Sequence, residues 1–269
     1  MANGTQIGRA GFRLLAELRR ESSGAWLREN AEAFEARVRT PFANTLERAA
    51  AGVRAEGENL AGGRQTLFRI WRDRRFRPNA PPVHAHVEGV LARPGERVGA
   101  RGAVSVRLDT DGGTLRAGSF LLDARGREAL RAAIVASEPR VHDLLRALKR
   151  AGAPVTATST LERGPRRFHA WLDTPLGFLL RMQDPMATAR IPKRAFSDGS
   201  AADVIVGFAR ATADWRAFTA AALEGVPVRG AMRRQPATAR PAGPPKPTRR
   251  RARAGSGRIP GGRSSARAR

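Results

Sequence analysis

The chain has 269 residues, and its 49 lysines and arginines outnumber its 24 aspartates and glutamates, which gives a formal charge of +25. Hydrophobic residues make up 41% of the sequence, enough for one full core or two small ones. The chain has no cysteine, which excludes disulfide scaffolds, cysteine-ligated zinc sites and cysteine nucleophiles.

Charged residues interrupt the first thirty positions of the chain, among them Arg9, Arg13, Glu17 and Arg19. They leave no apolar stretch long enough for a signal peptide or a membrane span. We therefore expect no membrane association and a cytoplasmic location.

Helical spacing of apolar residues dominates the N-terminal part of the sequence. It predicts one helix over 8–20 and a second that begins after Ser22 or Ser23 and continues to Val38. Thr40 and Pro41 are typical of the N-cap and first position of a third helix. The buried face of that helix is predicted to be Phe42, Leu46, Ala49 and Val53.

Short alternating patterns then predict strands at 66–72, 83–91 and 104–108. Asp111-Gly112-Gly113 is a turn signal, so 104–108 and 114–122 are expected to form a hairpin.

Helical patterns return after this hairpin, around 130–134 and from Pro139 to Gly152, and one more strand is expected at 154–161. Ser200 is the expected cap of a long final helix that ends before Gly225 and Pro227. N-terminal helices, a central antiparallel or mixed sheet and C-terminal helices together predict an α+β fold.

The C-terminal segment differs from the rest in composition. Residues 229–269 carry 13 arginines and lysines and no acidic residue. We expect an α+β domain over 1–226 and a disordered basic tail over 227–269, because the tail has too little apolar surface to fold. Its densest run contains the candidate residues for binding nucleic acid or another polyanion: Arg249, Arg250, Arg251 and Arg253. A solvated tail without a ligand, or a product of GC-rich coding, would have the same composition.

The densest polar cluster of the domain follows the predicted strand 66–72, on which Phe68 and Ile70 are expected to face the core. Arg72, Asp73 and Arg75 stand at the end of that strand. Arginines fixed beside a carboxylate present a fork that binds a phosphate or carboxylate ligand. The same residues also suit a structural ion pair that ties a loop to the sheet.

Three potential metal ligands, His84, His86 and Glu88, alternate along the predicted strand 83–91 and would project from one face. This spacing is short and unspecific, so we predict no metal and keep the three residues only as a weak candidate. The sequence has no Walker loop and no G-x-G-x-x-G, G-x-S-x-G or H-E-x-x-H motif, and we expect no cofactor.

Three segments of the chain resemble the bacterial family known as domain of unknown function 2461. The most specific is the run Phe68-Arg69-Ile70-Trp71-Arg72-Asp73, continued by Arg75-Phe76, Pro82 and His86. A leucine-rich first helix followed by Trp26-Leu27 and a looser pattern ending at Leu223 carry the rest of the resemblance, which spans about residues 10–224.

The resemblance carries Arg72, Asp73, Arg75 and His86 over as family-motif residues. At four other motif positions the family has lysine, lysine, tyrosine and lysine, whereas this chain has Pro78, Ala80, Val83 and His84. The family implies a fold and a candidate surface but no reaction.

Three functions follow as hypotheses. The first is a non-enzymatic binding protein whose tail associates with nucleic acid or another polyanion. The second is an enzyme or small-ligand binder that uses Arg72, Asp73, Arg75 and His86 on an anionic substrate. The third is a divergent family member with no retained site. The sequence leaves the catalytic residues and the oligomeric state open.

Overall fold

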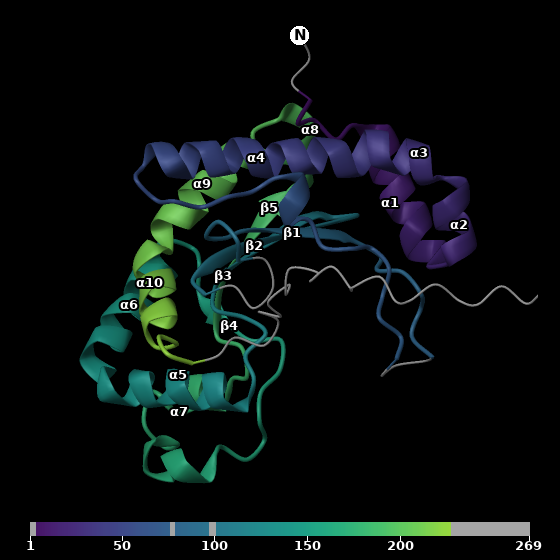
Figure 1. The fold of residues 1–269 in the computed structure, drawn as a ribbon. Coiled ribbons are helices and arrows are strands. Elements are labelled where there is room, and N and C mark those ends of the chain that lie inside the picture. Colours follow the sequence, from purple (N-terminus) through teal and green to yellow (C-terminus); the bar gives the residue numbers. More distant parts are fainter. Residues whose placement is uncertain (1–3, 76–78, 97–100, 227–269) are drawn as a thin grey trace, which may run out of the picture. The chain divides into compact units, whose positions relative to one another are not determined.

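The computed structural model describes residues 4–75, 79–96 and 101–226 (Figure 1). Helices precede and follow a five-stranded sheet, so the predicted α+β fold is confirmed. The predicted tail 227–269 lies outside the described residues, and its boundary, its disorder and its candidate arginines stay predictions. Within the described ranges, the structure contains no helix with the length and apolar character needed to cross a membrane.

The sheet is antiparallel throughout, with the strand order β1-β2-β3-β5-β4. Its strands are β1 Val87–Leu91, β2 Ala103–Asp109, β3 Gly112–Gly118, β4 Val155–Thr156 and β5 Met186–Pro192. The predicted hairpin is confirmed: β2 and β3 pair from Asp109 and Gly112 outward, which leaves a two-residue turn at Thr110 and Asp111. The predicted strand at 154–161 is too long, and no prediction covers β5.

The N-terminal helices begin largely where local signals place them. They are α1 Arg9–Glu21, α2 Gly24–Glu29, α3 Ala31–Phe34, a π-helix at Glu35–Arg39 and α4 Thr40–Ala55. The Ser23 hydroxyl accepts a hydrogen bond from the backbone N–H of Trp26 at 3.1 Å and caps α2. The prediction of Thr40 as an N-cap is wrong, because its backbone is already helical and the chain passes from α3 into α4 without a break.

The remaining helices are α5 Ala124–Ala136, α6 Glu138–Arg150, α7 Gly177–Arg181, α8 Lys193–Asp198, α9 Ala201–Ala211 and α10 Ala213–Ala221, with 3-10 turns at Arg64–Thr66 and Arg166–Trp171. The predicted long final helix is two helices. The chain breaks at Thr212, whose hydroxyl donates to the Phe208 carbonyl oxygen at 2.8 Å. Ser200 occupies the N-cap position of α9, as expected, but its hydroxyl donates to Asp198 and makes no capping hydrogen bond.

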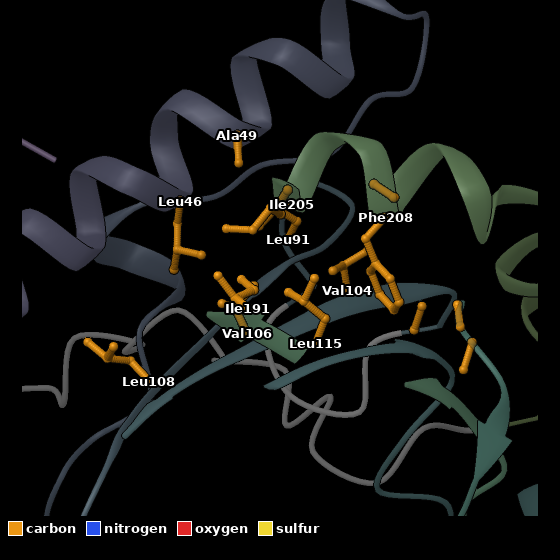
Figure 2. Packing of buried hydrophobic residues seen from close by; sticks show 14 of the residues in the cluster. Leu46, Ala49, Leu91, Val104, Val106, Leu108, Leu115, Ile191, Ile205 and Phe208 are labelled. Carbon is orange, nitrogen blue, oxygen red and sulfur yellow. The ribbon is translucent and has the colours of Figure 1, made fainter. Parts of the chain in front are cut away.

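The main core lies between one face of the sheet and the helices α4 and α9 (Figure 2). Figure 2 shows α4 and α9 contributing Leu46, Ala49, Ile205 and Phe208, which meet the strand residues Leu91, Val104, Val106, Leu108, Leu115 and Ile191. The predicted buried face of the third helix is thereby confirmed.

Alternate strand residues point to the opposite face, which we call the polar face: Glu88, Ser105, Arg107, Arg116 and Thr188. On this face Glu88 lies opposite Arg107, and Arg116 lies opposite both Ser105 and Thr188. The fold thus presents a row of charged and hydroxyl side chains on the side away from the main core.

Candidate functional site

Two segments run antiparallel at the edge of the sheet beside β1. They are joined by bridges between Leu67 and Gly89 and between Trp71 and Val83. Between these two bridges the first segment advances by four residues and the second by six. The two extra residues of the second segment form a bulge. For this reason the predicted strand 66–72 is wrong, and the predicted strand 83–91 begins only at Val87.

The bulge decides where the side chains of this edge point. Ile70 packs in the main core, whereas Phe68 packs with Val90 and Ala103 in a small second cluster, so the two do not share a face as predicted. The Arg72 N–H donates to the Pro82 carbonyl and the His84 N–H to the Ile70 carbonyl, both at 2.8 Å. These bonds hold the two segments together at the family motif.

The bulged edge lines a cavity of about 440 Å³, which we call the first cavity. Its polar lining includes Arg39, Arg72, Asp73, His84, His86 and Glu88. Its apolar lining includes Phe68, Trp71, Phe120 and Leu121. The structure therefore brings three of the four sequence candidates, namely Arg72, Asp73 and His86, to one cavity.

Arg75 does not line this cavity. Its guanidinium is paired with Asp73, with Nη2 2.5 Å from Oδ2. Hydrogen bonds from the Arg75 side chain and backbone lower the pKa of Asp73 to about 2. For Arg75 and Asp73, the interpretation as a structural ion pair therefore fits the geometry.

Arg72 differs from Arg75 in its surroundings. Its Nε atom is buried and has no hydrogen-bond partner among the described residues, and the same is true of Nε of Arg107 and of Arg39. Arg39 has Glu35 as an ion-pair partner at 3.7 Å, whereas no described carboxylate pairs with Arg72 or Arg107. The wall of the first cavity therefore contains the Arg72 guanidinium, which pairs with no described carboxylate and whose Nε–H has no acceptor among the described residues.

The two histidines lie close to each other and to Glu88. Their ring centroids are 5.2 Å apart, and His86 Nε2 lies 3.6 Å from Glu88 Oε2. The Ser105 hydroxyl donates to Glu88 Oε1 at 2.7 Å. In the described ranges no three histidine, aspartate or glutamate side chains are placed to hold a metal ion, so the weak candidate His84, His86 and Glu88 is not supported.

Burial and charge shift the protonation of this group in definite directions. Burial lowers the pKa of His84, and the positive charges of Arg72 and Arg107 lower it further against the opposing effect of Glu88. For Glu88, burial acts to raise the pKa, but the nearby His86 and the hydrogen bond from Ser105 outweigh it and leave the pKa below its ordinary value. At neutral pH Glu88 is ionised and His84 is uncharged.

Comparison with known proteins bears on the family expected from the sequence. A family model described as "Conserved hypothetical protein (DUF2461)" matches residues 10–218. The chain belongs to this family. Searches of curated proteins and of solved structures gave no match. The matched region contains the whole described sheet and every residue that lines the first cavity.

Sequence reasoning missed Arg39 and Phe120 of the first cavity, and it missed Arg107, which lies opposite Glu88 on the polar face but does not line the cavity. Arg39 and Phe120 come from segments far from the motif, and no local signal marks them. Arg107 did leave a signal, because it alternates with Val104, Val106 and Leu108 on a predicted strand. Its position on the same face as Glu88 became evident only from the pairing of β1 with β2.

Proposed function

We propose that this protein binds a small organic anion in the first cavity, with Arg72 as the principal contact. The observation that supports this most directly is the buried Nε–H of Arg72, which has no acceptor among the described residues. A buried donor left unpaired costs about 1–3 kcal/mol, and a ligand oxyanion would remove that cost. Guanidinium groups bind phosphate and carboxylate through two parallel hydrogen bonds.

The apolar lining indicates that the ligand is more than a bare inorganic ion. Trp71 is 42% exposed and Leu121 54% exposed, and both border the cavity together with Phe68 and Phe120. A volume of about 440 Å³ lies within the range of small-molecule sites, roughly 300–1,000 Å³. An anionic group against Arg72 and an apolar portion against the aromatic rings would satisfy both parts of the lining.

The position of the Trp71 ring in the lining of the cavity depends on a glycine. A Cβ atom at Gly24 would lie 2.8 Å from the Trp71 ring, so the close approach of α2 to this ring requires the absence of a side chain. Trp71, which lines the cavity, therefore lies close to the backbone of α2.

The protonation state of Asp73 makes it a poor general base. A carboxyl group with a pKa of about 2, as at Asp73, is ionised at neutral pH and is a weak base. We therefore propose a binding function and assign no reaction to the cavity.

The test is a comparison of Arg72→Gln with Arg75→Gln in isothermal titration calorimetry with inorganic phosphate and phenyl phosphate. Loss of a charged hydrogen bond of about 1.5–3 kcal/mol predicts roughly 10–150-fold weaker binding for R72Q. R75Q removes the same charge three positions away, outside the cavity lining, and is expected to bind within about twofold of the parent.

Two results would refute the anion-binding proposal. One is that neither anion binds the parent protein at millimolar concentration, which would favour a divergent member with no retained site. The other is that R75Q and R72Q weaken binding equally, which would mean that general charge, and not the cavity, attracts the anion.

A second proposal concerns the tail. We propose that residues 227–269 associate with nucleic acid or another polyanion, supported by 13 positive charges and no acidic residue over 229–269. The cytoplasmic location expected from the sequence is part of this proposal.

The tail proposal predicts that the full chain binds DNA and RNA oligomers in fluorescence anisotropy and that a variant ending at Pro227 does not. The logarithm of the association constant of the full chain should fall linearly with the logarithm of the salt concentration. On duplex DNA the slope should be about −0.9 for each neutralised phosphate. Equal binding by the truncated variant would contradict it.

A further inference from the structure

A second cavity of about 300 Å³ adjoins the first on the polar face. Three residues line both cavities: Glu88, Phe120 and Leu121. The two cavities therefore share a wall, and we call the pair of them the groove. A ligand held at Arg72 that extends past Phe120 enters the second cavity.

The two ends of the groove differ in charge. Besides the shared Glu88, the first cavity has three guanidinium groups in its lining, from Arg39, Arg69 and Arg72, against Asp73. The second has one guanidinium, Arg116, against the carboxylate of Asp184. An anion is therefore favoured at the first end, and a second anion at the other end would meet both Asp184 and Glu88.

The second cavity is rich in hydroxyl groups. Ser105, Thr156, Thr158 and Thr188 contribute to its lining. The Thr156 and Thr188 hydroxyl oxygens are 2.7 Å apart, and the Ser105 hydroxyl donates to Glu88 at 2.7 Å. Hydroxyl groups both donate and accept, carboxylates accept, and guanidinium groups donate. This mixture matches a neutral ligand portion that itself carries several hydroxyl groups.

Phe120 lies in the wall common to both cavities. An aromatic ring offers a flat apolar surface, and the C–H face of a sugar ring packs on such a surface while its hydroxyl groups reach polar neighbours. The sequence of features along the groove is thus cationic, aromatic and hydroxyl-rich.

We propose that the groove binds a sugar monophosphate, with the phosphate at Arg72 and the sugar ring extending past Phe120 into the second cavity. This inference rests on the proposed anion-binding function and names the ligand class for that site. The carboxylates of the second cavity disfavour a second phosphate, so a sugar bisphosphate binds less tightly than the monophosphate.

The experiment measures calorimetric affinities for inorganic phosphate, glucose 6-phosphate and glucose 1,6-bisphosphate. We expect glucose 6-phosphate to bind the parent protein at least tenfold more tightly than inorganic phosphate and more tightly than the bisphosphate. Thr188→Val keeps the side-chain shape and removes one hydroxyl of the 2.7 Å pair with Thr156. We expect this substitution to weaken the binding of glucose 6-phosphate about 5–10-fold, which corresponds to the loss of one hydrogen bond. The affinity for inorganic phosphate should stay unchanged.

Thr114→Val is the matched control, because Thr114 lies on β3 facing the same side of the sheet and lines neither cavity. It should leave all affinities unchanged, and thermal melts verify that both variants fold. Equal binding of inorganic phosphate and glucose 6-phosphate, or an unaltered glucose 6-phosphate affinity in T188V, overturns the sugar-monophosphate inference while anion binding at Arg72 stands. If phosphate binding does not depend on Arg72, the proposed function itself fails.

Discussion

Replacement of Arg216 by alanine is expected to lower the free energy of unfolding by about 3–5 kcal/mol, because it removes three hydrogen bonds made by a buried guanidinium. The Arg216 side chain on α10 is 4% exposed. Its Nη2 donates to Glu58 Oε1 at 2.7 Å and to the Ala209 carbonyl at 2.8 Å, and its Nη1 donates to the Gly102 carbonyl at 3.3 Å. One guanidinium thus joins α10 to α9, to the segment after α4 and to the start of β2.

Chemical denaturation monitored by circular dichroism measures this loss. Arg210→Ala is the matched control, because Arg210 is an exposed residue of α9 that pairs with Glu56 at the surface. Its removal should cost at most about 1 kcal/mol. If R216A and R210A were equally stable, the three contacts of Arg216 would not contribute to the stability of the fold.

Leu46→Ala is the second substitution with a large expected effect, about 2–5 kcal/mol of unfolding free energy. Leu46 is fully buried on α4, and its side chain fills the space above Gly89 on β1, where a Cβ atom would lie 2.6 Å from Leu46 Cδ1. Truncation leaves a void between helix and sheet that the backbone of Gly89 has no side chain to fill.

The matched control for this truncation is Leu121→Ala, the same chemical change at a residue that is 54% exposed. We expect it to alter stability by no more than about 0.5 kcal/mol. Denaturation midpoints of the two variants decide the point: a cost for L46A as small as that for L121A would mean that α4 is not held on the sheet by this contact.

Elements with strong local signals were predictable from the sequence. The amphipathic spacing of α1 and α4 and the cap at Ser23 depend on neighbouring residues alone, and the structure confirms them. Strand β5 carries no such signal, because its core-facing residues include Ala187 and Ala189, which are small. Its conformation is set by pairing with β3, which a local pattern does not reveal.

The candidate site was predictable only in part, for a related reason. Arg72, Asp73 and His86 lie within one motif, and the sequence indicated all three. The separation of Arg72 from the paired Arg75 depends on the bulge between the two edge segments, and a bulge has no periodicity of its own. The second cavity depends on five separate parts of the chain that meet only in the folded sheet.

The π-helix Glu35–Arg39 contributes one residue to the lining of the first cavity. A π-helical turn holds one residue more than the corresponding α-helical turn, and such turns are frequent at functional sites. Arg39, its last residue, lines the cavity, and Glu35, its first, pairs with both Arg39 and Arg64. Deletion of one residue from this turn would restore α-helical pairing and rotate the preceding helices by about 100° relative to α4.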